Sequence, residues 1–157
     1  MKEQKTNVMR LLEQKKIKYT PHGDDAVDGA TVAAICGLDP SQVFKTLVAR
    51  GASKSIYVFD VPVTGELDLK KAAKAAGEKS IAMIHVSEIN ALTGYIRGGC
   101  SPIGMKKQYK TFIDISAQDK ETIMVSAGKI GYQVELDPNA LVDMIRAKFA
   151  DLVSENE

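Results

Sequence analysis

The sequence predicts an α/β protein of the α+β type, built on a mixed and strongly curved β-sheet with helices on its outside. Three observations support this fold class. The predicted strands outnumber the helices that could act as crossovers between parallel neighbours, several strands lie close enough in sequence to form hairpins, and no linker or internal repeat divides the 157 residues. We therefore expect one domain over residues 1–157, long enough to bury a hydrophobic core.

The first quarter of the chain predicts short elements. Thr6 is suited to cap a helix that runs to about residue 15, with apolar residues near helical spacing, and a strand over residues 17–20 follows. Residues 29–37 have the pattern of a short helix that ends at a glycine. Residues 39–41, Asp-Pro-Ser, offer a cap and first turn for another helix.

A hairpin comes next, because residues 43–49 and 55–61 are β-prone runs separated by a turn at residues 51–54. Beyond it, residues 68–76 predict a helix that Asp68 opens and Gly77 closes. A short strand over residues 81–84 and a helix from Ser87 to Leu92 complete this part of the chain.

The last third predicts three strands and a final helix. The strands cover residues 111–115, 122–126 and 131–136, and a turn at residues 127–129 links the last two. Asp137 and Pro138 form a suitable N-cap and first position for the helix. The apolar residues that repeat on one face of this helix are Leu141, Ile145 and Phe149.

The composition is that of an ordinary globular protein, with 45% hydrophobic and 26% charged residues. No stretch approaches the roughly 18 apolar residues of a membrane span, and the first ten residues lack the apolar core of a secretory signal, so we expect a cytoplasmic protein with no membrane partner. A net charge of +1 is not that of a typical nucleic-acid-binding domain. DNA is not expected as a partner, and any RNA contact must be local. Two lysine clusters could make such a contact or could simply be solvated: Lys70, Lys71 and Lys74, and Lys106, Lys107 and Lys110.

Metal and cofactor motifs are absent from the sequence. Cys36 and Cys100 are far apart and belong to no CxxC or Cys/His ligand pattern, so we interpret both as free thiols. Neither Gly-x-Gly-x-x-Gly nor Gly-x-x-x-x-Gly-Lys-Ser/Thr occurs, which weakens dehydrogenase and kinase interpretations. We expect no metal and no cofactor.

Lys45 is the most informative residue, because its ammonium interrupts the apolar run from Val43 to Val48. A charge is costly to bury without a partner, so such a lysine either lies on the wet face of its strand or reaches into a site. Residues 94–102 form a glycine-rich loop whose bare backbone could approach a ligand. We expect Lys45 and this loop to face each other.

Four segments, in this order and spacing, resemble the YbaK family: residues 43–47, 61–71, 93–107 and 125–136. The resemblance extends from about Val8 to about Leu152. Proteins of this family are trans-editing aminoacyl-tRNA deacylases related to the insertion domain of bacterial prolyl-tRNA synthetase. The resemblance implies a mixed sheet that is partly closed like a barrel and flanked by helices.

The resemblance also implies an enzyme that removes a wrongly attached amino acid from tRNA, most typically cysteine from tRNA(Pro). The acceptor end of aminoacyl-tRNA is then the substrate, and a prolyl-tRNA synthetase is a candidate partner. His22 and His85 belong to no evident Ser/His/Asp arrangement, so a protein nucleophile is not expected. In cysteine-editing members the substrate's own thiol is thought to attack its carbonyl, and a positioned intramolecular attack reaches effective molarities of roughly 10⁵ to 10⁸ M.

Lys45 matches the family's functional lysine and is a candidate catalytic residue. Its ammonium could donate to the ester carbonyl, to the charge that develops there, or to the terminal phosphate. The alternative is a lysine that extends from a strand into solvent. Thr46 is a candidate substrate-binding residue, although in a regular strand it points to the opposite face and would need a bend or a backbone contact.

The loop supplies further candidates. Gly98, Gly99, Ser101 and Pro102 match the family's Gly-Gly-x-Ser-Pro pattern, and Gly94 begins the loop. The amides of Gly98 and Gly99 are candidate catalytic donors to an oxyanion, and the other three are candidate substrate-binding residues. A tight turn without catalytic duty would also require glycine.

The fourth segment bears on specificity. Ser126 and Gly128 resemble the family's Ser-Gly-Gly-Lys stretch and are candidate substrate-binding residues, although a plain hairpin turn would explain them equally well. Gln133 stands where many cysteine-editing members carry an acidic residue, and the tyrosine often found after the first strand has no clear match. The sequence therefore indicates the deacylation reaction more clearly than it indicates which amino acid is removed.

Three functions remain open. The leading one is a Cys-tRNA(Pro) deacylase, and the second is a deacylase for another small misacylated residue such as alanine or serine. The third is a non-catalytic tRNA-binding or regulatory module. Cys100 lies inside the loop, but no histidine is evidently paired with it, so we do not expect it to act as a nucleophile.

Overall fold

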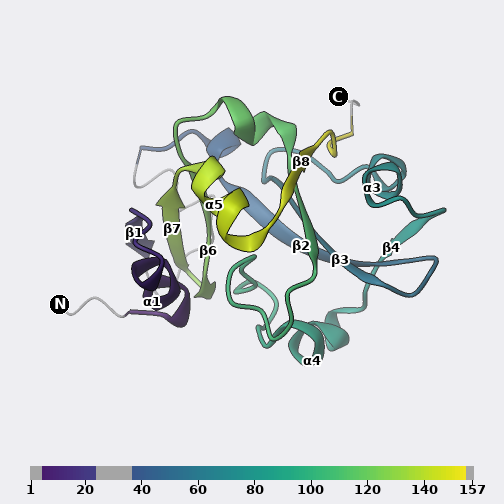
Figure 1. Cartoon of the computed structure of the whole chain (residues 1–157), viewed down its shortest axis with the longest axis horizontal. Helices are drawn as coiled ribbons and strands as arrows, with labels where there is room; N and C mark the ends of the chain where they lie inside the picture. Colours follow the sequence, from purple (N-terminus) through teal and green to yellow (C-terminus); the bar gives the residue numbers. More distant parts are fainter. Residues whose placement is uncertain (1–4, 24–36, 155–157) are drawn as a thin grey trace.

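The computed structural model describes residues 5–23 and 37–154, and it contains two β-sheets with helices packed outside them (Figure 1). The smaller sheet has the strand order β1 (Thr20–Gly23), β7 (Tyr132–Leu136) and β6 (Ile123–Lys129). The larger sheet has the order β4 (Ile81–Met83), β2 (Phe44–Gly51), β3 (Ile56–Pro62), β5 (Lys110–Asp114) and β8 (Lys148–Ala150).

The α+β class and the mixed sheet are confirmed, because β2 runs antiparallel to β3 and β4 while β5 runs parallel to β3 and β8. The expectation of a partly closed, barrel-like sheet is wrong. Both sheets are open, and an isolated bridge between Val43 and Met124 connects them. A 3₁₀ turn ends immediately before Val43, so little extended chain precedes Val43 that could extend its pairing with the strand of Met124.

The α-helices are α1 (Asn7–Gln14), α3 (Leu69–Ala76), α4 (Ile89–Thr93) and α5 (Pro138–Ile145), and the 3₁₀ turns are η1 (Pro40–Gln42), η2 (Val86–Glu88) and η3 (Ile115–Asp119). Three predicted N-caps are confirmed, since the side chains of Thr6, Asp68 and Asp137 accept hydrogen bonds from the first-turn amides of α1, α3 and α5. Gly77 closes α3 in the left-handed region, at φ +73°, as predicted.

Two predicted elements near the N-terminus have different outcomes: the first strand starts later than predicted, and the second helix lies almost wholly outside the described residues. The first strand begins at Thr20 rather than at residue 17, because Lys16 turns into the left-handed region and the Ile17 amide still bonds to Leu12 at the end of α1. The helix predicted for residues 29–37 lies outside the described residues except for its last glycine.

Three further boundaries differ from the prediction. Ser87 lies inside η2, and α4 begins only at Ile89. The turn expected at residues 127–129 is instead part of β6, which carries a bulge there and continues to Lys129. Phe149 lies in β8 rather than in the last helix, because Arg146 adopts φ +56° and ends α5.

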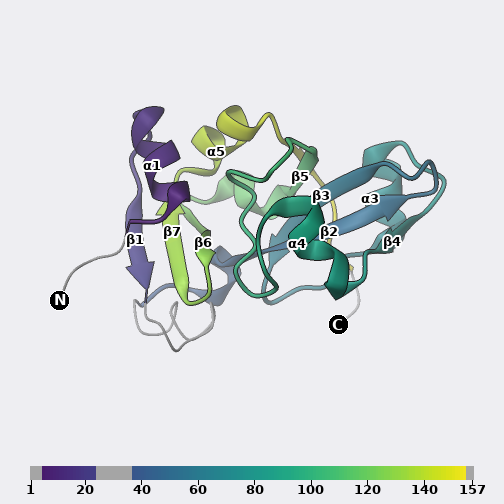
Figure 2. The ribbon, with the colours of Figure 1, turned by 90° about the horizontal axis from the view of Figure 1, so that it is seen from below.

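The hydrophobic core consists of two main clusters, one under each sheet. The first packs the smaller sheet against α1 and α5, through residues such as Leu12, Val125 and Leu141. The second packs the larger sheet against α3, through Phe59 and Ala72. Figure 2 shows α1 and α5 beside the smaller sheet and α3 beside the larger one. The face of β2 opposite α3 is therefore left to the loop segments that form the site.

Candidate active site

A cavity of about 440 Å³ lies along the edge of β2, a volume within the range of small-molecule sites. Every residue from Val43 to Val48 borders it. Consecutive residues of a strand alternate between its faces, so a cavity bordered by all of them must run along the strand edge. That edge is accessible because β4 pairs with β2 only from Ala49 to Gly51.

The other walls come from several segments far apart in sequence. The β4–α4 segment contributes an apolar wall, in which Met83 and Val86 are unusually exposed for large hydrophobic residues. The glycine loop and the smaller sheet contribute a wall with polar groups. Besides the β2 segment, the lining residues are Val63, Met83, Ile84, Val86, Ile89, Arg97, Gly98, Cys100, Ser126 and Gln133.

The structure brings together part of the predicted site. Four of the candidate residues border the cavity: Lys45, Thr46, Gly98 and Ser126. Five candidates are not among its lining residues: Gly94, Gly99, Ser101, Pro102 and Gly128. The predicted meeting of the β2 segment and the glycine loop is therefore present, but it involves fewer residues than expected.

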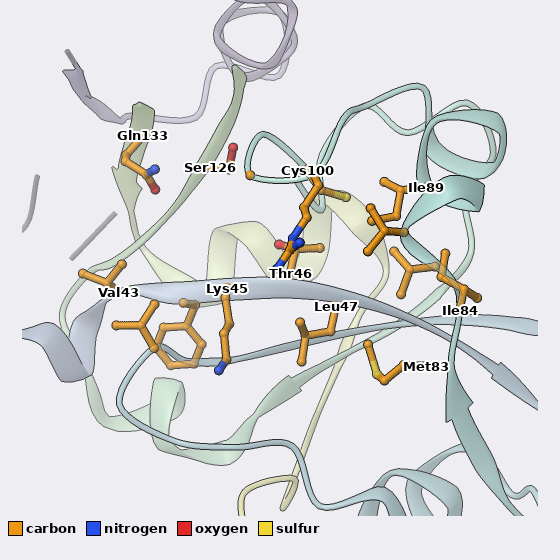
Figure 3. A pocket seen from close by; sticks show the side chains of 16 residues that line it. Val43, Lys45, Thr46, Leu47, Met83, Ile84, Ile89, Cys100, Ser126 and Gln133 are labelled. Atoms are coloured by element: carbon orange, nitrogen blue, oxygen red, sulfur yellow. The ribbon is translucent and has the colours of Figure 1, made fainter. Parts of the chain in front are cut away.

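The Lys45 side chain does not converge on the loop. It points away from Cys100 and Ser126 (Figure 3), and its Nζ lies 3.7 Å from Glu66 Oε2. Lys45 pairs with Val61 in the register of β2 and β3, and Val61 belongs to the core cluster beneath α3. The expectation that this ammonium and the loop face each other is thus wrong for the conformation seen here, because Lys45 leaves β2 on the face that α3 covers.

Thr46 leaves β2 on the opposite face, as predicted from strand alternation. Its Oγ1 lies 2.5 Å from Oδ1 of Asp60, the residue opposite it on β3. Asp60 has no exposed surface, and burial raises its pKa from 3.8 to about 7, although the hydrogen bond from Thr46 acts in the other direction. No bend in the strand is needed to bring Thr46 to the cavity, because the cavity follows the strand edge.

Within the loop, Gly98 and Gly99 differ in what their amides can do. The Gly99 amide donates to the Ile96 carbonyl at 3.0 Å, so the prediction that it serves as an oxyanion donor is wrong. A Cβ on Gly99 would lie 3.1 Å from the Ile130 nitrogen, so this glycine permits close packing of the loop on the β6–β7 turn. Gly98 adopts φ +87°, and its amide has no partner within the described segments.

The remaining predicted residues have packing or turn roles. Gly94 ends α4 at φ +87°, and the fully buried Ser101 hydroxyl accepts a hydrogen bond from an amide two residues further on. Pro102 is buried next to it. Gly128 adopts φ +90°, and a Cβ there would lie 3.0 Å from the Tyr95 ring. These four residues shape the loop and its support rather than the cavity surface.

Two lining residues carry polar groups that the sequence analysis did not list as binding residues. The Arg97 guanidinium has no ion pair among the residues that the structure describes. Gln133 is only 6% exposed, and its carboxamide has no hydrogen-bond partner in the same part of the chain. The sequence signal that could have identified Arg97 as a binding residue was its position as a cation inside the glycine loop. Gln133 was noted in the sequence only as a departure from the family pattern.

Cys100 is a free thiol that borders the cavity. Burial raises its pKa to about 11, and a hydrogen bond with Thr93 opposes that rise only in part. The thiol is therefore protonated near neutral pH, and a protonated thiol is a poor nucleophile. This agrees with the expectation that Cys100 does not carry the chemistry.

Within residues 5–23 and 37–154, no group of three or more His, Cys, Asp and Glu residues is arranged to hold a metal ion. No helix in these segments has the length and apolar character needed to cross a membrane.

Taken together, the fold and the cavity define an α+β domain with a small-ligand site at the junction of two sheets. The family model of the aminoacyl-tRNA editing domain matches residues 23–144. A protein of Enterococcus faecalis (strain ATCC 700802 / V583), which bears the provisional name Cys-tRNA(Pro)/Cys-tRNA(Cys) deacylase EbsC, is 44% identical over 157 residues that cover 98% of this chain and 96% of that protein. The chain belongs to the aminoacyl-tRNA editing domain family, which confirms the resemblance to YbaK proteins.

Two further proteins are similar to this chain at lower identity. The uncharacterized protein YwhH of Bacillus subtilis (strain 168) is 25% identical over 116 residues, covering 74% of this chain and 73% of that protein. A crystal structure described provisionally as a trans-editing enzyme for prolyl-tRNA synthetase superposes with a TM-score of 0.82 at 24% identity, covering 94% of each chain. The latter shows a shared fold.

Proposed function

We propose that this chain is a trans-editing hydrolase that cleaves the ester of mischarged tRNA, with Cys-tRNA(Pro) as its main substrate. The observation that carries the proposal is the 44% identity, over nearly the whole of both chains, to a relative that bears the name of a Cys-tRNA(Pro)/Cys-tRNA(Cys) deacylase. The cavity adds physical support, because it is large enough for an amino acid and part of the terminal nucleotide and has both an apolar and a polar wall.

The protein's chemical task is to hold and polarise the ester. The Gly98 amide is the loop's free donor to the developing oxyanion, and the Thr46 hydroxyl is a second polar group at the same cavity. The Cys100 thiol stays protonated, so the attacking group is supplied by the substrate thiol or by water. A substrate thiol held close to its own carbonyl benefits from the high effective molarity of intramolecular attack.

Two cations can hold the terminal phosphate. Arg97 borders the cavity without an ion pair in the described residues. Lys45 is paired with Glu66, but the Glu66 side chain is 85% exposed and the contact is long, so little free energy is lost when a phosphate replaces it. A flexible lysine on an open strand edge can turn from Glu66 to the substrate, which retains Lys45 as a candidate catalytic residue.

Gln133 and Ser126 face the same cavity from the smaller sheet (Figure 3). The Gln133 carboxamide lines the cavity without a hydrogen-bond partner among the described residues, so it is free to bind a polar substrate atom. We assign Gln133 to recognition of the bound amino acid's polar atoms. A neutral carboxamide attracts a substrate ammonium less strongly than a carboxylate would, so alanine and serine remain the competing amino acids that need testing.

A chain that recognises the acceptor end would act in translation, and we propose that it does so in the cytoplasm, with prolyl-tRNA synthetase as the enzyme that generates its substrate. The structurally similar protein described as a trans-editing enzyme for that synthetase supports this partnership. Lys106 and Lys107 are exposed beyond the glycine loop and could contact the tRNA backbone, although Lys106 Nζ also donates a long hydrogen bond of 3.5 Å to the Ala91 carbonyl, whereas Lys71 is engaged with Asp151.

The experiment is a deacylation assay on tRNA(Pro) charged with Cys, Ala or Ser, and on Cys-tRNA(Cys). We expect Cys-tRNA(Pro) to be hydrolysed fastest, and we expect Lys45→Ala and Arg97→Gln each to lower kcat/KM by at least tenfold. Lys79→Ala, which changes an exposed lysine outside both lysine clusters and outside the cavity lining, is the matched control and should leave the rate unchanged. Failure to cleave any of the four substrates, together with salt-sensitive tRNA binding, would favour the non-catalytic alternative.

A further inference from the structure

Asp60 is a buried carboxyl group that the proposed chemistry does not use. It lies in the middle of β3 with no exposed surface. Its Oδ1 is hydrogen-bonded to the Thr46 hydroxyl, and its Oδ2 has no hydrogen-bond partner in the described part of the chain. No cation within that part forms an ion pair with it. A carboxyl in such a place is costly for the fold, so its presence calls for a function.

The position of Thr46 gives the carboxyl access to the site. The Val43 carbonyl accepts a hydrogen bond from Val63, so the odd-numbered residues of β2 direct their backbone groups to β3. Thr46 and Asp60 therefore form a pair without backbone hydrogen bonds between them, the kind of pair in which opposing side chains lie closest. Because Thr46 also borders the cavity, it links a fully buried acid to the place where substrate binds.

We propose that Asp60 is a positioning residue whose proton sets the direction of its hydrogen bond with Thr46, and thereby decides whether the Thr46 hydroxyl can donate to the bound ester. This inference rests on the function proposed above. It assigns Asp60 no contact with the substrate and requires no movement of the backbone.

The two states follow from donor and acceptor chemistry. An ionised carboxylate only accepts hydrogen bonds, so the Thr46 hydroxyl must donate to it and presents only lone pairs to the cavity. A protonated carboxyl can donate from Oδ1 to the Thr46 oxygen, and the hydroxyl proton of Thr46 is then free for the ester oxygen. The proton moves between Asp60 and solvent, and no covalent bond in the substrate changes in this step.

Both states are populated near neutral pH, because burial raises the Asp60 pKa to about 7. The titratable neighbour that interacts with Asp60 from the loop is Cys100, which stays neutral because its own pKa is about 11. Thr46 on β2 is uncharged, and Ile113, opposite Asp60 on β5, is apolar. Lys45 leaves β2 on the other face. The titration thus belongs to Asp60 itself.

The test compares deacylation by wild type and Asp60→Asn between pH 6 and pH 8. The asparagine amide can donate permanently to the Thr46 oxygen, so the hydroxyl proton of Thr46 stays free at every pH. At pH 8 about one-tenth of Asp60 in the wild type would carry its proton, so we expect the ratio of the variant rate to the wild-type rate to rise about tenfold from pH 6 to pH 8. Spontaneous hydrolysis is subtracted from each rate, and titration of the substrate affects both proteins alike, so the ratio removes it.

Thr46 variants provide the control. Thr46→Ser keeps the hydroxyl and should keep the pH-dependent ratio, whereas Thr46→Val should abolish it whichever residue occupies position 60. A flat ratio in the wild-type background would overturn the proposal. If the wild type cleaves no substrate at any pH, the proposed function fails instead, and the two failures are therefore distinct.

A second measurement is independent of activity. The carboxyl ¹³C resonance of Asp60 should titrate near pH 7, and Thr46→Val should move its midpoint upward because the hydroxyl bond favours the ionised form. A midpoint near pH 4, or one that Thr46→Val leaves in place, would contradict the proposed coupling between the two side chains.

Discussion

Arg50 and Glu88 tie strand β2 of the larger sheet to the apolar wall of the cavity. Arg50 Nη2 lies 2.7 Å from Glu88 Oε1, and Nη1 lies 3.5 Å from Oε2. The same Oε2 also accepts a hydrogen bond from the His85 amide at 3.0 Å. One carboxylate therefore fixes both the start of η2 and its distance from β2. Val86 and Ile89, which line the cavity, depend on this contact for their position.

Glu88→Gln should loosen this wall without changing any group that touches the ester. We expect a several-fold higher KM for Cys-tRNA(Pro) and a nearly unchanged kcat, because a loosened wall weakens binding more than chemistry. Steady-state deacylation kinetics measure both values. Glu121→Gln, at an exposed position outside the cavity lining, is the matched control. A fall in kcat with unchanged KM would contradict the assignment.

Cys100→Ser tests whether the loop thiol takes part in the chemistry. A thiol with a pKa of about 11 is almost entirely protonated at pH 7.5, so we expect the serine variant to retain a deacylation rate within about threefold of wild type. Single-turnover hydrolysis of Cys-tRNA(Pro) is the measurement. Loss of several orders of magnitude, or a trapped acyl-enzyme on Cys100, would establish a nucleophile instead.

Gly99→Ala tests the packing role assigned to the second glycine of the loop. The added Cβ would approach backbone atoms of the β6–β7 turn, with 3.1 Å to the Ile130 nitrogen, and backbone cannot yield as a side-chain tip does. We expect the free energy of unfolding to fall by about 1–3 kcal/mol, measured by urea denaturation. Gly77→Ala, which has open space but φ +73°, controls for strain without a clash and should cost about 1 kcal/mol.

Asp60→Asn should change how stability depends on pH. In wild type the unfolded chain loses the Asp60 proton near pH 4 and the native state keeps it to about pH 7, so the contribution of Asp60 to stability is lost as the pH rises through that window. Asparagine has no such loss. Relative to wild type, the variant should gain on the order of 3 kcal/mol between pH 4 and pH 8. Urea denaturation at both pH values provides the check, and equal differences would contradict a buried neutral acid.

Much of the fold was predictable from local signals. Thr6, Asp68 and Asp137 cap helices because their side chains satisfy free first-turn amides, a requirement that depends on neighbours in sequence. The β2–β3 hairpin was equally local. The division into two sheets was not predictable, because it depends on how far β2 and β6 remain paired beyond Val43, and strand periodicity does not report on that.

The site was predicted at the level of segments more than of individual groups. The apolar run around Lys45 and the glycine loop do border one cavity. The direction of the Lys45 ammonium depends on which face of β2 is covered by α3. The Gly99 amide is unavailable because it donates a hydrogen bond to the Ile96 carbonyl within a turn. The Asp60 carboxyl gave no signal, since an aspartate within an apolar strand looks the same in the sequence whether it is buried or solvated.

The bridge between Val43 and Met124 has a mechanical consequence. Lys45 and Thr46 belong to the larger sheet, and Ser126 and Gln133 belong to the smaller one. The width of the cavity therefore depends on the angle between the two sheets, which are joined at this bridge. A substitution that tilts one sheet relative to the other, even far from any reacting atom, changes the distance between the cavity residues of the two sheets. The contact between Val43 and Met124 therefore sets the distance between the two groups of cavity residues. A substitution that changes the packing of Met124 would lower the catalytic rate although Met124 does not contact the substrate.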